Sequence, residues 1–264
     1  MMFGRLIYTE LLKLRRYPVL WVGVVGMFAC VALTVVQTGA SDGTIWDFSL
    51  FAGNVLWSSF DIFFPAIITL VAGYILTREL TDDTLKNILT VPISFKKLVL
   101  GKLLTIAIIA IALGIVLWIF TVLANVLILG FPGVNAGIYI KLLTQFCVEH
   151  LLLTIACLPI IVATCKKPNL FPMGVGLAFF YGFCGSMTAG HGLSDYYPPS
   201  ATLTLIGYDN ASGGILHHTP NAALAGFVLI LMLLLAMVML YKMKVPGELK
   251  YTKKKKKTTR GQRP

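Results

Sequence analysis

The dominant pattern of the sequence is a series of six long apolar runs separated by short polar segments. The runs cover residues 19–36, 51–76, 103–129, 139–164, 170–189 and 222–241. An apolar run of 18 or more residues is typical of a transmembrane helix, because about 20 residues are needed to cross the hydrocarbon layer of a bilayer. The pattern therefore predicts an all-α integral membrane protein with six transmembrane helices.

Three of these runs are longer than a bilayer requires. The runs at residues 51–76, 103–129 and 139–164 all exceed about 20 residues, and Pro65 interrupts the first of them. We expect such helices to tilt, to kink or to extend beyond the membrane.

The segment before the first run has an amphipathic pattern. Apolar residues recur at helical spacing within residues 3–16, namely Phe3, Ile7, Leu11 and Leu14. Basic residues occupy the other faces, so this segment is predicted to be an interfacial helix that lies in the headgroup plane. The alternative is an extension of the first transmembrane helix. Pro18 favours a break between the two, because the residue before a proline is pushed out of the helical region.

Composition and charge support this interpretation and orient the chain. Charged residues make up 12% of the sequence, against about 25% in soluble proteins. Of the 22 Lys and Arg residues, only Lys141 lies in a segment that alternation would place outside the cell. Because cytoplasmic loops carry the excess of Lys and Arg, both termini are predicted to be cytoplasmic.

The strongly basic end of the chain forms a separate region in this prediction. Residues 1–244 form one transmembrane domain, and residues 245–264 form a polybasic cytoplasmic tail. The net charge of +11 depends largely on this tail. The anionic inner leaflet is its expected partner, since juxtamembrane cations gain roughly 1 kcal/mol each at that surface. No nucleic-acid partner is expected.

The loop at residues 78–102, between the second and third runs, predicts a short cytoplasmic helix. Thr81 is placed to cap its N-terminus, two aspartates follow in the first turn, and Pro92 ends it. Leu85, Ile88 and Leu89 form one apolar edge. A short capped helix with an apolar edge suits docking into a groove of another protein. The alternative is a helix that lies on the lipid surface.

Two carboxylic residues lie inside predicted membrane helices. Asp61 lies in the second run and Glu149 in the fourth, next to His150. Ionisable residues within a membrane are rare and mark functional sites by default, so both are candidates for a substrate pathway that binds a cationic group. The alternative is a structural carboxyl group paired with a neighbouring helix. His150 is expected to be a hydrogen-bond partner.

The fifth run carries small residues at a spacing of four. This ridge consists of Gly174, Ala178, Gly182, Ser186 and Gly190. Small residues at this spacing allow two helices to approach closely. The ridge therefore predicts a helix-packing face, either against a second subunit or against another helix of the same chain.

The sequence gives no sign of a catalytic or metal site. The five cysteines lie in or beside apolar runs without metal-ligand spacing, which indicates packing residues. An intramembrane metalloprotease built on Glu149, His150 and His191 lacks the H-E-x-x-H spacing. A stand-alone secondary transporter would need repeats and broken helices, and no repeat is evident in the sequence.

The loop after the second run also resembles a known family. Its residues are similar to the first cytoplasmic loop of type-2 ABC exporter permeases, most of all the bacitracin and lantibiotic transport and immunity group. The matching residues are Glu79, Thr84, Leu85, Lys86, Asn87, Leu89, Thr90, Pro92, Ser94, Lys102, Leu103 and Leu104.

The resemblance implies a role for this loop and a set of partners. In that family the loop is a coupling helix that contacts a separate ABC ATPase, and the implied coupling residues are Glu79, Thr84, Leu85, Lys86, Ile88, Leu89 and Pro92. ATP and Mg²⁺ would be bound by that ATPase, since this chain has no G-x-x-x-x-G-K-[ST] motif. A second permease subunit and a short re-entrant helix after Pro199 are also implied.

The function that the resemblance implies is non-catalytic export across the plasma membrane of a bacterium. The implied cargo is an amphiphilic antimicrobial peptide, which would be moved out of the membrane for resistance or self-immunity. The alternatives are an ABC exporter permease for another lipid-like or drug substrate and a secondary transporter. The apolar runs do not themselves identify the cargo.

Overall fold

The described part of the protein is a bundle of helices. The computed structural model describes residues 2–14, 18–40, 45–81, 95–165, 170–188, 193–208 and 220–242, and these residues contain no strand. The elements are α1 (Met2–Leu14), α2 (Val19–Ala40), α3 (Phe48–Ser58), η1 (Ser59–Phe63), α4 (Phe64–Thr81), α6 (Phe95–Ala124), η2 (Asn125–Leu129), α7 (Ala136–Thr164), α8 (Phe171–Thr188), α9 (Pro198–Leu205) and α10 (Ala222–Tyr241).

Five helical stretches of the described chain are long and apolar enough to cross a membrane. They are Val19–Ala40, Phe48–Arg78, Lys97–Leu129, Ala136–Thr164 and Ala222–Tyr241. The all-α membrane architecture is thus confirmed, and these five stretches coincide with five of the six predicted runs. The remaining run, the fifth, corresponds to α8, which has 18 residues.

The predicted break at Pro65 takes the form of a π turn. Residues Ser59–Phe63 form η1 between α3 and α4, and the amide of Phe64 donates to the carbonyl of Ser59, five residues earlier. Proline has no amide hydrogen and its ring clashes with the preceding turn. The wider turn removes that clash and keeps the two helices nearly continuous. Asp61 lies within this turn.

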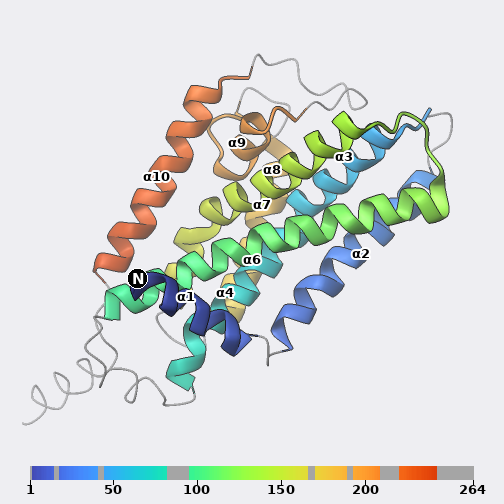
Figure 1. Ribbon diagram of the computed structural model, residues 1–264. Coiled ribbons are helices and arrows are strands. Elements are labelled where there is room, and N and C mark those ends of the chain that lie inside the picture. Colours follow the sequence, from blue (N-terminus) through green and yellow to red (C-terminus); the bar gives the residue numbers. More distant parts are fainter. Residues whose placement is uncertain are drawn as a thin grey trace, which may run out of the picture.

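The helices α4 and α7 lie inside the bundle and α2 and α10 lie outside (Figure 1). Helix α4 packs against α2, α6, α7 and α8, while α10 packs against α7 and α9. The largest buried side chains near α3, η1 and α4 are aromatic, and they include Phe48, Phe51, Phe60, Phe64 and Phe146. The outer faces of α2, α6, α8 and α10 expose large apolar side chains, as expected of helices in lipid.

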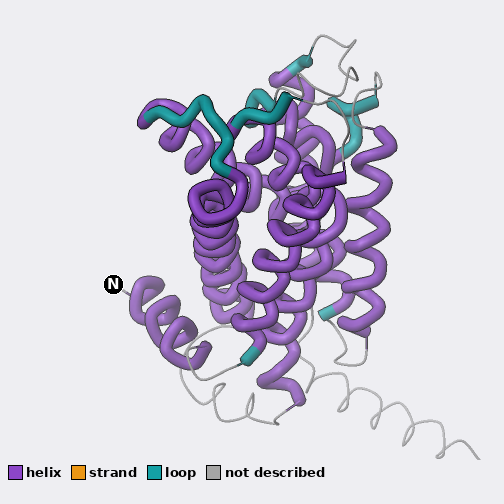
Figure 2. The backbone as a smooth tube through the Cα atoms, turned by 90° about the vertical axis from the view of Figure 1, so that its right-hand side faces the viewer, coloured by secondary structure: helices purple, strands orange, loops and turns teal. Residues whose placement is uncertain are grey.

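Two short helices, α1 and α9, lie at opposite ends of the bundle (Figure 1), and α1 is the helix beside the N mark in Figure 2. Helix α1 crosses one end beside α6, as the amphipathic pattern predicted, and α9 is tucked into the other end between α7, α8 and α10. The last turn of α10 lies at the same end as α1 (Figure 1). The five cysteines are free thiols in the structure, and Cys30, Cys157 and Cys165 are buried.

The start of α6 differs from the predicted boundary of the loop at residues 78–102. The sequence placed Lys102 at the end of a loop, but α6 begins at Phe95 and Lys102 lies in its second turn with only 3% of its surface exposed. A basic residue beside an apolar run is ordinarily at a membrane surface. Here its side chain is covered by α1 and α4, which a local pattern does not reveal.

Candidate functional site

The predicted coupling residues lie mostly outside the described residues. Thr84, Leu85, Lys86, Ile88, Leu89 and Pro92 all belong to the segment 82–94, which is not described. Glu79 lies in the last turn of α4. The two helices that flank this segment are joined, because Lys102 Nζ of α6 donates a hydrogen bond to the carbonyl of Ile75 in α4 over 2.8 Å.

The candidate substrate-pathway residues lie around the π turn and α9. Glu149 is buried in α7, with 1% of its surface exposed. The Thr202 hydroxyl of α9 donates a hydrogen bond to Glu149 Oε1 over 2.7 Å. The second carboxyl oxygen, Oε2, has no hydrogen-bond partner among the described residues. A buried polar atom without a partner is costly, so this oxygen is a candidate contact for a donor group.

His150 faces a different element from Glu149. Its Nδ1 lies 2.8 Å from the carbonyl oxygen of Phe146, and its Nε2 lies 3.3 Å from the Ser59 hydroxyl of η1. Because a carbonyl only accepts, Nδ1 carries a proton and Nε2 of the neutral ring accepts from Ser59. The ring of Phe64 packs at a centroid distance of 4.2 Å. Two adjacent residues of α7 therefore hold two separate elements, α9 and η1.

Asp61 lies on the side of η1 that faces α8. The Ser186 hydroxyl of α8 interacts with its carboxyl group, whereas Asp61 Oδ1 is buried without a hydrogen-bond partner in the described part of the chain. Asp61 and Glu149 thus share one property, a buried carboxyl oxygen that no described donor reaches. The structure gives no direct contact between them.

The small-residue ridge of α8 packs within the chain. A Cβ atom on Gly174 would lie 2.6 Å from Thr164 Oγ1, and one on Gly182 would lie 2.6 Å from the carbonyl oxygen of Asp61. Ala178 is fully buried, and Gly190 lies outside the described residues. These contacts correspond to the alternative in which the ridge packs against other helices of the same chain.

Helix α9 is held by several polar contacts that the sequence did not reveal. The Tyr197 hydroxyl donates to the carbonyl of Tyr181 over 2.9 Å. Asp195 accepts from the Thr204 hydroxyl at 2.8 Å and from the amide of Asn221 at 2.9 Å. The sequence feature that could have indicated these contacts is the cluster of hydroxyl residues after Pro199. Hydroxyl groups alone, however, do not identify their hydrogen-bond partners.

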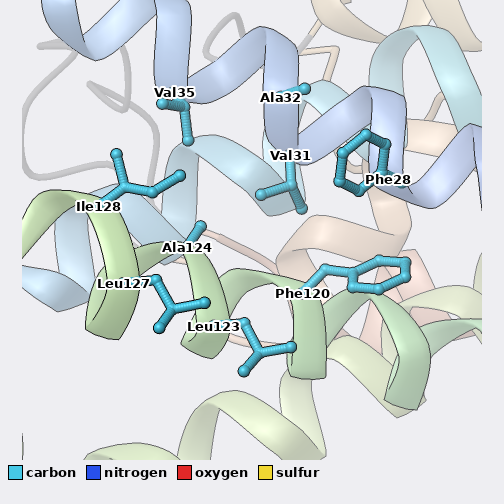
Figure 3. A pocket seen from close by; sticks show the side chains of 9 residues that line it. All are labelled: Phe28, Val31, Ala32, Val35, Phe120, Leu123, Ala124, Leu127 and Ile128. Atoms are coloured by element: carbon cyan, nitrogen blue, oxygen red, sulfur yellow. The ribbon is translucent and has the colours of Figure 1, made fainter.

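An apolar groove lies between α2 and the end of α6 with η2 (Figure 3). Its volume is about 360 Å³, more than twice the roughly 150 Å³ of an engineered cavity that binds benzene. Phe28 and Phe120 lie edge to face in it, with ring centroids 5.8 Å apart. Every described side chain that lines it is a hydrocarbon: Phe28, Val31, Ala32, Val35, Phe120, Leu123, Ala124, Leu127 and Ile128. A hydrocarbon chain matches this lining.

Glu149 and His150 contact different elements, α9 and η1. His191, the third residue of the enzyme alternative, lies outside the described residues. The site offers buried hydrogen-bond acceptors beside an irregular helix turn, and π turns frequently occur at functional sites.

Comparison with known proteins identifies the family. Residues 6–185, about two thirds of the chain and including α2, α4, α6 and α7, match the model of the ABC-2 family transporter protein. The chain is also 32% identical over 102 residues to the bacitracin transport permease protein BCRB of Bacillus licheniformis, a match that covers 39% of this chain. The matched segment spans 49% of that relative. The chain is therefore a multi-pass membrane protein that belongs to the ABC-2 family of transporter proteins.

Proposed function

We propose that this chain is the permease subunit of an ATP-driven exporter and that a separate ABC ATPase subunit binds and hydrolyses ATP with Mg²⁺. The observation that carries this proposal is the family match over residues 6–185. Two features support it. The sequence has no phosphate-binding loop of its own, and only the short segment 82–94 separates the end of α4 from the start of α6.

The segment 82–94, with Glu79 before it, is the proposed contact with the ATPase. Binding of ATP closes the ATPase dimer, and that motion displaces the segment together with the ends of α4 and α6. A nucleotide shifts such an equilibrium only if its affinity differs between the two states. The hydrogen bond from Lys102 to Ile75 supports this role, because it makes the two helix ends respond together.

Six crossings with cytoplasmic termini belong to the same proposal. Helix α8, with 18 residues, is about 27 Å long, close to the roughly 30 Å of a hydrocarbon layer. It lies within the bundle against α4, α7 and α9, where it need not be apolar on every face. The last turn of α10 and helix α1 lie at the same end of the bundle, which also supports an even number of crossings. A second permease subunit completes the translocation path.

The proposed cargo is an amphiphilic antimicrobial peptide, exported for resistance or immunity. The similarity to a bacitracin transport permease supports this class. The buried acceptor oxygens of Asp61 and Glu149 suit a donor or cationic group, and the groove between α2 and α6 suits an apolar one. Another lipid-like or drug substrate is the alternative that the same chemistry allows.

The proposal is tested by copurification and reconstitution. The full chain is expressed with candidate ABC ATPases, and the pair is reconstituted in lipid nanodiscs. We expect an ATPase to copurify and bacitracin or a lantibiotic to stimulate ATP hydrolysis. Stimulation only by lipids or drugs would replace the peptide cargo with the alternative, and failure of any ATPase to bind would refute the permease role.

The coupling contact is tested separately from membrane insertion. Glu79→Ala and the double change Leu85→Ala with Leu89→Ala should abolish peptide resistance while the chain still inserts. Ile45→Ala is the matched control, because Ile45 is 93% exposed in the described structure. It follows the C-terminal end of α2 and lies outside the segment 82–94. Normal resistance in the coupling variants would contradict the assignment of this segment.

A further inference from the structure

The apolar groove between α2 and α6 begins where the two helices stop filling the space between them. Near the start of α2 they are in close contact, because a Cβ atom on Gly23 would lie 3.0 Å from Leu113 Cδ2 of α6. Further along both helices, Phe28 and Phe120 meet edge to face with ring centroids 5.8 Å apart. The two contacts advance together, so α2 and α6 run in the same direction, and both end away from α1 (Figure 1). The groove lies beyond the phenyl pair.

The long axis of the groove follows the direction of the helices. Figure 3 shows Phe28 and Phe120 at one end of the groove and Val35 with Ile128 at the other. Seven residues separate Phe28 from Val35, which corresponds to roughly 10 Å along α2. The groove is therefore a slot that is bounded at one end by two phenyl rings.

This slot has the depth of one leaflet. Helix α2 has 22 residues and Phe28 is the tenth of them, so Phe28 lies near the middle of the span. Trp21 is exposed at the start of α2, and Trp46 stacks on Phe131 just beyond the other ends of α2 and η2. Because tryptophan is enriched at both membrane–water interfaces, these residues mark the two headgroup levels. The slot thus extends from near the bilayer centre toward the interface beside Trp46.

The dimensions of the slot match one acyl chain. An acyl chain starts beneath the headgroups and ends near the bilayer centre, about 15 Å deeper. The volume of the slot is about 360 Å³. A helix about 10 Å wide would need roughly 800 Å³ over the same length, so a helix of a second copy is too wide. The described lining is entirely hydrocarbon, and the polar backbone of a peptide would find no hydrogen-bond partner in it.

The slot is open to the surroundings of the bundle along its side. Its floor is buried, since Val31 is 4% exposed and Ala124 is 8% exposed, whereas Leu127 and Ile128 at its rim are largely exposed. A chain can therefore enter sideways from the lipid. The floor would lose dispersion contacts if no atoms lay against it, and within a bilayer such packing contacts, rather than the hydrophobic effect, decide what binds.

We propose that this groove is a binding site for one acyl chain of a membrane phospholipid, whose methyl end lies against Phe28 and Phe120. The lipid belongs to the leaflet at the end of the bundle away from α1. This inference goes beyond the proposed export function and requires neither the ATPase nor the cargo, because lipid surrounds the chain at all times. The bound chain takes the place of side chains between α2 and η2, so it is retained when the surrounding lipid is removed.

The test detects a retained lipid by photocrosslinking. The full chain is reconstituted in nanodiscs that contain phosphatidylethanolamine with an alkyl diazirine near the methyl end of one acyl chain or, in a parallel sample, near its carbonyl group. The protein is then extracted, washed in lipid-free detergent and irradiated, and the crosslinked residues are identified by mass spectrometry. The exposed side chains of α10, including Phe227, Ile230 and Leu234, report lipid that is only loosely bound.

We expect the washed protein to be labelled in the groove and not on α10. The methyl-end probe should label Phe28 and Phe120, and the carbonyl-end probe should label Val35 and Ile128. This order along the groove follows from the proposed direction of the chain.

Two matched variants test whether the groove holds the lipid. Ala32 lines the groove and is exposed at its rim, so Ala32→Phe should fill the groove and abolish the labelling. Ala112 is an exposed alanine of α6 that does not line the groove, so Ala112→Phe should leave the labelling unchanged. Helical content is compared in both variants to confirm that they fold.

The remaining outcomes would overturn the proposal. Absence of labelling in the washed protein, or equal labelling of α10, would mean that only surrounding lipid is present. Labelling that survives Ala32→Phe, or that is also lost in Ala112→Phe, would place the lipid elsewhere. Loss of labelling on addition of bacitracin would assign the groove to the cargo. Disulfide-linked dimers that form with Leu127→Cys but not in the unmodified chain would assign it to a second copy.

Discussion

Replacement of Gly182 by alanine tests the packing that holds the π turn in place. A Cβ atom at this position would lie 2.6 Å from the carbonyl oxygen of Asp61, 2.7 Å from Pro65 Cγ and 3.2 Å from the carbonyl oxygen of Phe60. All three atoms belong to the backbone or to a proline ring, so none of them rotates away. Gly176 on the same helix has no atom within 4 Å of a Cβ atom, which makes Gly176→Ala the matched control.

The expected size of the effect follows from two opposing terms. An unobstructed change from glycine to alanine stabilises a helix by roughly 0.8–1.0 kcal/mol. Overpacking costs about 1–3 kcal/mol, and we expect the upper end here because the neighbouring atoms are rigid. Gly182→Ala should therefore lower the free energy of unfolding by about 2 kcal/mol, while Gly176→Ala should raise it or leave it unchanged. The gap of about 2–3 kcal/mol between the variants corresponds to a factor of roughly 30 to 140 in the folding equilibrium.

The assay is reversible unfolding of the purified protein in mixed micelles, with helical content as the signal. The midpoints of the two variants are compared with that of the unmodified protein. Equal midpoints for Gly182→Ala and Gly176→Ala would show that α8 does not press against η1 in the membrane. The intrachain contact of the ridge would then be wrong, and its role as a face for a second subunit would be favoured instead.

Three further predictions concern the hydrogen bond between Thr202 and Glu149, the groove between α2 and α6, and the hydrogen bond from Lys102 to Ile75. Thr202→Val should lower the free energy of unfolding by about 1–3 kcal/mol because Glu149 loses its donor, and Thr144→Val, which loses only a bond within an exposed turn, should not change the unfolding midpoint in micelles. Ala124→Trp should fill the groove and abolish crosslinking by a photoactivatable alkyl lipid, and undiminished crosslinking would refute hydrocarbon binding there. Lys102→Met should lower the free energy of unfolding by about 1–3 kcal/mol in the same assay, because the carbonyl of Ile75 loses its donor while Glu10 keeps Lys13 as its partner, and an unchanged midpoint would contradict this contact.

The long elements of the fold were predictable because the pattern that defines them is local. The last run was predicted at residues 222–241, and α10 spans Ala222–Tyr241. The amphipathic spacing before Pro18 predicted α1, and the break at Pro65 was also expected. The form of that break was not, because a π turn and a simple kink leave the same residues in the sequence.

The tertiary partners of polar residues were not predictable in the same way. Glu149 was marked by its charge inside a membrane helix, but its donor Thr202 lies 53 residues further along the chain. Lys102 was expected in a loop because it is basic and lies beside an apolar run. The sequence does not show that Glu10, in a separate helix, lies close to it. Both contacts depend on how helices pack, and the periodicity of one helix carries no information about the residue that faces it.

The extra residue in η1 has a consequence for how this protein tolerates changes in length. A helix turns by about 100° per residue, so the π turn offsets the buried face of α4 from that of α3. Deletion of one residue between Ser59 and Phe63 would restore a regular helix and rotate α4 relative to α3. The face that holds Ile68, Val71 and Ile75 would then turn away from the bundle. In this segment, natural variation must therefore preserve the number of residues, because that number sets the rotation of α4 relative to α3. The identity of any one side chain matters less.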